Sequence, residues 1–223
     1  MFSNITSIFQ NLRTDPGGTI LYLIMFTSGI LFSLIIHECA HGYAALKCGD
    51  PTAKWMGRLS LDPRKHLDPI GTLCMLFMRV GWAKPVPINP RYFRHYRRDY
   101  IIVSMAGICA NLIMFLLSTV VTALIYKHAT AQWMSYLFQF FLMLAQMNLS
   151  LAVFNLLPVP PLDGYRFLDQ FVFNGRLSMD RRTMQIIQII FLGVCISGLL
   201  NGLLSTVNTT IFNAVFNFVF RLL

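Results

Sequence analysis

The sequence predicts a mainly α-helical, polytopic membrane bundle, because its composition and its long uncharged segments both differ from those of soluble domains. Hydrophobic residues make up 56% of the 223-residue chain and charged residues 12%, compared with about 45–50% and 25% in soluble domains. Uncharged segments long enough to cross a bilayer as helices recur along the chain. We therefore expect one membrane domain over residues 1–223, with about five spans and six as the alternative.

The predicted spans cover residues 18–46, 100–126, 133–157, 183–200 and 203–221. The first is expected to be retained, since no small-residue cleavage site follows a short apolar segment. The last two divide an uncharged segment, Thr183–Phe220, which as one helix would be about 57 Å long, against a bilayer core of roughly 30 Å. Its Asn-Gly pair, within Leu199–Leu204, offers the break.

The net charge of +9 is explained by orientation in the membrane. Of the 18 Lys and Arg residues, eleven lie between Lys47 and Arg98 and four between Arg166 and Arg182. Basic residues confined to alternate loops follow the positive-inside rule, so both groups are expected on the cytoplasmic side, near anionic lipid heads. We expect the lipid bilayer as a partner and no nucleic acid.

Residues 70–93 are expected to form a short re-entrant β-hairpin region. Ile70–Met78 is apolar but too short to cross the bilayer as a helix. Val80–Phe93 contains the Gly, Pro and aromatic residues typical of strands and turns. Since lipid cannot satisfy irregular backbone, this region should pack against the spans.

The first span ends in the sequence HECAH, which contains the only glutamate of the chain, Glu38. His37 and His41 are four residues apart, so on a helix their imidazoles share one face and can begin a zinc site. Glu38 lies on the neighbouring face, where it can reach a water molecule as general base without being a ligand. HExxH also occurs by chance on soluble helices, but polar groups inside a span are costly and usually functional.

Two histidines are too few for a catalytic zinc site, which generally has three protein ligands. His66 and His95 lie in the basic loop, and His128 is expected on the opposite side of the membrane. Asp163 follows a span that ends on the same side as HECAH, after prolines that oppose helix and before Gly164, which allows a tight turn. The residues leave two interpretations open, a third zinc ligand folded back toward the histidines or a solvated turn aspartate.

These features together resemble the site-2 protease family of intramembrane zinc metalloproteases, particularly its small prokaryotic members without PDZ or CBS domains. The resemblance covers Leu34 to about Leu168. It rests on HECAHGYAALKCGDPTAKWMGRLSLDPRKHLDPIGT, GWAKPVPINP, SMAGICANL and FNLLPVPPLDGYRFL, which occur in this order. It also implies that the re-entrant region lies near the path of the substrate.

The resemblance implies a role for individual residues. His37, His41 and Asp163 would be the ligands of Zn²⁺, and Glu38 the catalytic base and proton shuttle. Asn155 matches a family asparagine that helps to position the substrate or to stabilise the oxyanion, and it is a candidate catalytic residue.

Asn111 is a candidate substrate-binding residue. It matches the asparagine that ends an AGPxxN-like stretch of the family, although this chain has Ile108 where a proline is usual. The alternative is that Asn111 forms a buried polar bridge between helices.

The implied function is zinc-dependent hydrolysis of peptide bonds in or near transmembrane helices of membrane-protein substrates, as in regulated intramembrane proteolysis. The enzyme would be a multi-pass protein of the cell membrane with its active site toward the cytoplasm, and a homo-oligomer is compatible with the sequence. Two other classes remain open, a metal-binding or metal-transporting membrane protein and an inactive relative that only binds. The clustering of the polar groups near one face argues against transport, and the presence of Glu38 argues against inactivity.

Overall fold

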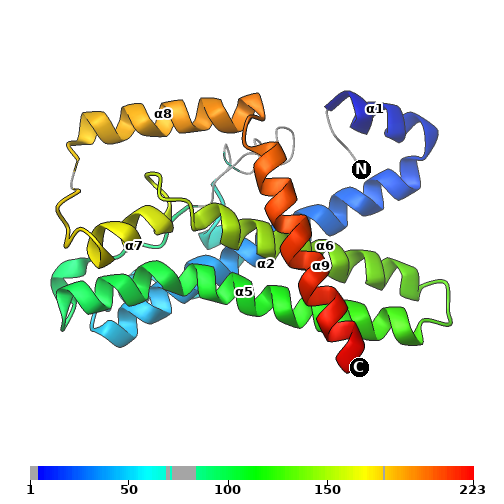
Figure 1. The fold of residues 1–223 in the computed structure, drawn as a ribbon, viewed down its shortest axis with the longest axis horizontal. Coiled ribbons are helices and arrows are strands. Elements are labelled where there is room, and N and C mark those ends of the chain that lie inside the picture. Colours follow the sequence, from blue (N-terminus) through cyan, green and yellow to red (C-terminus); the bar gives the residue numbers. More distant parts are fainter. Residues whose placement is uncertain (1–4, 69–70, 72–83, 178) are drawn as a thin grey trace.

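Three long helices lie side by side and form the body of the protein (Figure 1). They are α2 (Pro16–Cys48), α5 (Tyr96–His128) and α6 (Met134–Asn155), and a short helix, α1 (Ile5–Thr14), precedes them. The structure is a computed structural model that describes residues 5–68, 71, 84–177 and 179–223. The predicted mainly helical bundle is therefore confirmed.

The first predicted span forms α2, and local sequence signals set both of its ends. Asp15 caps the helix by accepting a hydrogen bond from the Gly18 N–H at 3.0 Å, and Pro16 occupies the first turn. Gly49, at φ 111°, ends it in a left-handed conformation that favours glycine. At 33 residues the helix is about 50 Å long, so it is longer than a bilayer core of roughly 30 Å.

The next two predicted spans correspond to α5 and α6. α5 begins four residues earlier than predicted, because Asp99 in its first turn accepts a hydrogen bond from the His95 N–H at 2.8 Å. α6 ends at Asn155, shortly before Pro158. Both boundaries bring polar side chains to the end of the bundle where α2 terminates.

The uncharged C-terminal segment divides into two helices, as predicted, but the break lies at residues 198–200, and the Asn-Gly pair that was expected to form it begins the second helix. α8 (Arg181–Ser197) ends at Gly198, whose φ is 77°, and α9 (Asn201–Leu222) crosses α5 and α6 (Figure 1). Among the described helices, α2, α5, α6 and α9 are long and apolar enough to span a membrane. α8 is a shorter apolar helix of 17 residues, so the total of five spans stays a prediction.

Two apolar clusters hold the bundle together. One joins α2 to α5 through Ala45 and Val103. The other joins α5 to α6 through Phe115 and Leu149, and Phe212 of α9 packs against it. Ala45 lies one turn after His41, so α2 and α5 are fixed against each other beside the candidate site.

The segment around Asp163 differs from the prediction. Residues 156–162 form turns, but Asp163 begins a helix, α7 (Asp163–Phe171), and Gly164 lies inside that helix rather than in a tight turn. Glycine is required at this position because the backbone of Leu156 lies very close, and a Cβ atom on residue 164 would lie 2.3 Å from the Leu156 carbonyl oxygen. Gly164 thus lets α7 pack directly against the end of α6.

The predicted β-hairpin is not confirmed. Residues 69–70 and 72–83 lie outside the described part of the chain. Residues 84–89 have no regular secondary structure and are followed by a short 3₁₀ helix, η2 (Pro90–Tyr92). On the loop between α2 and this segment, the structure has α3 (Thr52–Trp55) and η1 (Pro63–Lys65).

Candidate active site

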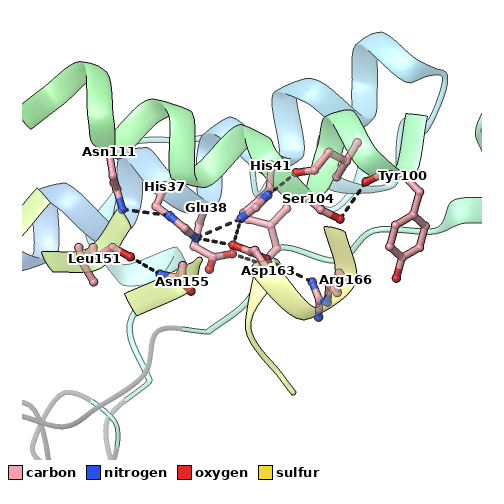
Figure 2. Close-up of polar contacts among 12 residues, drawn as sticks. His37, Glu38, His41, Tyr100, Ser104, Asn111, Leu151, Asn155, Asp163 and Arg166 are labelled. Atoms are coloured by element: carbon pink, nitrogen blue, oxygen red, sulfur yellow. Dashed lines mark hydrogen bonds and ion pairs between the residues drawn. The ribbon is translucent and has the colours of Figure 1, made fainter. Parts of the chain in front are cut away.

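Three side chains that the sequence singles out as zinc ligands meet in the structure (Figure 2). The Nε2 atoms of His37 and His41 are 3.0 Å apart, and the Oδ2 atom of Asp163 lies 3.1 Å from the first and 3.0 Å from the second. Each residue is only 5–6% exposed. Asp163 therefore folds back toward the histidines, across 126 and 122 positions of the chain.

This cluster has the chemistry of a zinc site. Three acceptor atoms this close repel one another unless a proton or a cation lies between them. Zinc bound tetrahedrally to nitrogen and oxygen keeps its ligand atoms about 3.3 Å apart, close to the spacing here. Among the residues that the structure describes, His37, His41 and Asp163 form the one group of three metal-binding side chains within 4.8 Å of one another. The residues present thus fit Zn²⁺.

α5 contacts both histidines on the ring nitrogen that points away from Asp163. The Nδ1 atom of His41 lies 2.7 Å from the carbonyl oxygen of Val103, and that of His37 lies 3.1 Å from Nδ2 of Asn111. Between these two contacts lies Gly107, where a Cβ atom would be 2.4 Å from Nε2 of His41. The backbone of α5 can approach the imidazoles this closely only because residue 107 has no side chain.

Asp163 stands in the first turn of α7, with its carboxylate ionised. Burial alone would raise the pKa of this carboxyl group, but its hydrogen bonds with His37 and His41 outweigh that effect and hold the pKa well below its usual range. The other carboxylate oxygen, Oδ1, lies 3.8 Å from Nη1 of Arg166, a half-exposed side chain one turn further along α7. An ionised carboxylate is the form that binds a metal ion.

Glu38 has one oxygen tied to the backbone of a distant segment. The N–H of Val86 donates a hydrogen bond of 2.8 Å to Oε2 of Glu38, and Val86 is buried. Glu38 is next to His37 in sequence but is not part of the group of three ligand atoms. Its second oxygen is therefore the one available for a water molecule.

The segment that carries Val86 is itself held by buried side chains of the preceding loop. The Arg58 guanidinium donates hydrogen bonds to the carbonyl oxygens of Lys84 and Pro85, at 2.7 and 3.1 Å. Asp50, fully buried, accepts a hydrogen bond from the Asn89 N–H at 2.6 Å. Both ends of the segment are thus anchored, with Glu38 bound between the anchors.

The remaining predicted residues lie around this cluster. Asn155 is at the end of α6 beside the cluster in Figure 2, and its side-chain amide donates to the carbonyl oxygen of Leu151 at 2.9 Å. His66, considered as a ligand, is buried elsewhere and lies with Nε2 2.7 Å from the carbonyl oxygen of Ser60. Asn111 is fully buried against His37.

Sequence reasoning missed the groups that support the ligands. Val103 and Gly107 precede Asn111, which the sequence had already singled out, at a four-residue spacing that puts all three on one helix face, so these two positions could have been found. The contacts of Arg58 and of the Val86 N–H could not have been found, since the first depends on backbone acceptors 26 and 27 positions away and the second on a backbone donor, which any residue except proline has.

Comparison with known proteins identifies the family of the chain. Residues 119–198 match Peptidase family M50. The chain is 40% identical over 187 residues to "Putative zinc metalloprotease YwhC" of Bacillus subtilis, covering 82% of this chain and 84% of that protein. It is 34% identical over 154 residues to "Putative zinc metalloprotease Rip2" of Mycobacterium tuberculosis, covering 66% of this chain and 56% of that protein.

A Mycolicibacterium smegmatis protein, also named Rip2, is 33% identical over 160 residues, which make up 60% of its length. No solved structure matches the chain. The identity to YwhC over most of both chains, together with the match of residues 119–198, shows that this chain belongs to Peptidase family M50.

Proposed function

We propose that the chain hydrolyses peptide bonds in or near transmembrane helices, with His37, His41 and Asp163 as the ligands of Zn²⁺ and Glu38 as the general base. The observation that carries this proposal is the buried group of three candidate ligand atoms, each about 3 Å from the others, with Glu38 beside it (Figure 2). Membership of Peptidase family M50 supports the zinc metalloprotease activity.

The residues divide the chemistry between them. When bound, zinc acts as a Lewis acid that polarises the scissile carbonyl group and makes water a stronger acid. The free oxygen of Glu38 takes the proton of the attacking water, while Oε2 stays bonded to the Val86 N–H. Glu38 then delivers that proton to the leaving amine, so that both products are released and the carboxylate is restored. Asn155, at the end of α6, is proposed to position the substrate or to stabilise the oxyanion.

The substrate class follows from where the site lies. α2, α5, α6 and α9 are apolar enough to span a membrane, so the substrate is proposed to be another membrane protein. Because the carbonyl groups of a helix are hydrogen-bonded within it, a substrate helix must unwind locally before hydrolysis. The basic residues between Lys47 and Arg98 support a cytoplasmic position for this end of the bundle.

The experiment compares purified variants in liposomes with a panel of single-span peptides that carry Gly or Pro pairs in the cytoplasmic half of the helix. Glu38→Gln is expected to bind one zinc ion per chain and to cleave none of the peptides that the wild type cleaves. Asp163→Ala is expected to lose both zinc and cleavage. Asp62→Asn makes the same change of carboxylate to amide at an exposed position and should keep both.

Two results would contradict the proposal. If Glu38→Gln protein cleaves the peptides at the wild-type rate, Glu38 is not the base. If the wild type instead moves zinc across the liposome membrane and Asp163→Ala abolishes that flux, the cluster belongs to a transporter. The zinc content of Asp163→Ala distinguishes the two interpretations of Asp163. Zinc is lost if Asp163 is a metal ligand and is kept if Asp163 is a solvated turn aspartate.

A further inference from the structure

The contact between Asn111 and His37 leaves a buried oxygen without a partner. Asn111 is fully buried, and among the described residues its Oδ1 atom has no hydrogen-bond partner. Its Nδ2 atom is the one that faces Nδ1 of His37, at 3.1 Å. Buried amide oxygens are almost always hydrogen-bonded, so this arrangement requires an explanation.

With the Asn111 amide in this orientation, the matching neutral tautomer of His37 is one that cannot bind a metal ion at the cluster. If Nδ2 of Asn111 donates to Nδ1 of His37, the neutral ring carries its proton on Nε2. That nitrogen faces Asp163 and His41, where a ligand must offer a lone pair. Binding zinc through Nε2 therefore requires the proton to move to Nδ1, where it needs an acceptor.

A half-turn of the amide supplies that acceptor. The oxygen and nitrogen of an asparagine side chain exchange places when the amide rotates by 180°. After this rotation, Oδ1 of Asn111 accepts a hydrogen bond from Nδ1–H of His37, and the orphaned oxygen gains its partner. His41 already has the matching arrangement, because its Nδ1 faces the carbonyl oxygen of Val103.

We propose that Asn111 is a positioning residue of the zinc site, which holds His37 in the metal-binding tautomer through a hydrogen bond from Nδ1–H to Oδ1. This proposal rests on the ligand set given under the proposed function, and it adds a residue that orients one of those ligands. The carbonyl of Val103 performs the same task for His41. Two acceptors on one face of α5 thereby orient two ligands on α2.

The spacing along α5 supports this assignment. Val103, Gly107 and Asn111 are four residues apart in turn, as His37 and His41 are on α2. The absent side chain at Gly107 brings the α5 backbone against both rings, since a Cβ atom there would lie 2.5 Å from Cε1 of His37. The Asn111 side chain thus contacts the imidazole of His37 on the side away from Asp163.

The test is the zinc affinity of the purified full-length protein, measured by competition with a chromophoric chelator. Asn111→Leu removes the acceptor and should weaken zinc binding by about 10- to 100-fold. Asn111→Asp keeps an acceptor on Nδ1–H and should bind zinc about as tightly as the wild type. If the leucine variant does not fold, Asn111→Ala serves the same comparison with a smaller side chain.

Asn148→Leu is the matched control. Asn148 is likewise fully buried between helices, but its Nδ2 atom donates to Oγ of Ser33 at 2.9 Å and contacts no ligand. Its replacement removes an equal buried amide and should leave zinc affinity unchanged. Circular dichroism of each variant in the same detergent checks that the helices remain.

Three results would overturn the proposal: wild-type zinc affinity in Asn111→Leu, weak affinity in both Asn111→Leu and Asn111→Asp, or an equal loss in Asn148→Leu. A raised KM at unchanged zinc affinity would return Asn111 to a substrate-binding role and would also overturn it. Failure of the proposed function gives a different result. Wild-type protein that binds zinc but cleaves no peptide would contradict the proposed activity, while the zinc affinities of the Asn111 variants could still be compared.

Discussion

The backbone N–H of Val86 donates a 2.8 Å hydrogen bond to Oε2 of Glu38, although the two residues are 48 positions apart in the chain. The proposed general base is therefore oriented by a loop segment that lies outside its own helix. A backbone donor is fixed in direction by the chain, so it can hold one carboxylate oxygen while the other faces the site. This contact links the segment at residues 84–89 to the proposed chemistry.

Replacing Val86 by proline should slow catalysis without removing zinc. The substitution deletes the N–H donor, and residues 84–89 have no regular secondary structure that a further proline would interrupt. Glu38 then loses its fixed orientation, and we expect kcat to fall by up to about 100-fold at unchanged KM and zinc content. Val86→Ala retains the N–H and is the control for lost packing. A wild-type kcat in Val86→Pro would show that the hydrogen bond from the Val86 N–H to Glu38 does not contribute to catalysis.

Arg58 should act through the same contact. Its guanidinium holds the carbonyl oxygens of Lys84 and Pro85, so Arg58→Gln should release the segment and lower kcat by about tenfold. Arg64→Gln, the same change at an exposed position of this loop, should have no effect. Because both changes loosen Glu38, the double variant with Val86→Pro should be little slower than Val86→Pro alone. Fully additive losses would mean that Arg58 acts elsewhere.

Gly164→Ala should disturb the packing of α7 and with it the position of Asp163, the proposed third zinc ligand. The added Cβ atom would meet the carbonyl oxygen of Leu156 at 2.3 Å, and overpacking of this kind costs about 1–3 kcal/mol of unfolding free energy. We expect a lower unfolding temperature and less than one zinc ion per chain. Gly202→Ala, in α9 with no atom within 4 Å of the new Cβ, should be neutral or slightly stabilising. Equal behaviour of the two variants would contradict the close approach.

The proposed orientation can be tested by labelling from either side of the membrane. In a background without the five native cysteines, Lys65→Cys should react with a membrane-impermeant maleimide only in inverted vesicles, where the cytoplasmic face is outside. Lys127→Cys, at the other end of α5, should react only in right-side-out vesicles. Both positions are exposed in the structure. The reverse pattern would place the site on the outer side of the membrane.

The parts of the fold that sequence predicted well are those set by local signals. Uncharged stretches of sufficient length gave α2, α5, α6 and α9 close to their observed bounds. The division of the C-terminal segment into two helices was predicted as well, but it occurs at Gly198, whose left-handed conformation ends α8, and not at the Asn-Gly pair, which begins α9. His37 and His41 could be paired because helix periodicity alone puts residues four apart on one face.

The remaining features depend on contacts between distant segments. Gly164 suggested a tight turn, whereas its role is to admit the backbone of Leu156, which sequence does not reveal. Asn111 could be recognised as a buried polar residue, but its neighbour could not be named without the packing of α5 on α2. The hydrogen bond between Val86 and Glu38 has no side-chain signature on the donor side.

Zinc K-edge X-ray absorption of the purified wild type, compared with Asp163→Ala, tests the central claim most directly. If His37, His41 and Asp163 hold the metal, the wild-type spectrum should show two imidazole nitrogens at about 2.0–2.1 Å and oxygen ligands at about 2.0–2.2 Å, without sulfur. The Asp163→Ala protein should have lost that zinc. A Zn–S distance of about 2.3 Å in the wild type, or an unchanged spectrum in Asp163→Ala, would contradict the assignment.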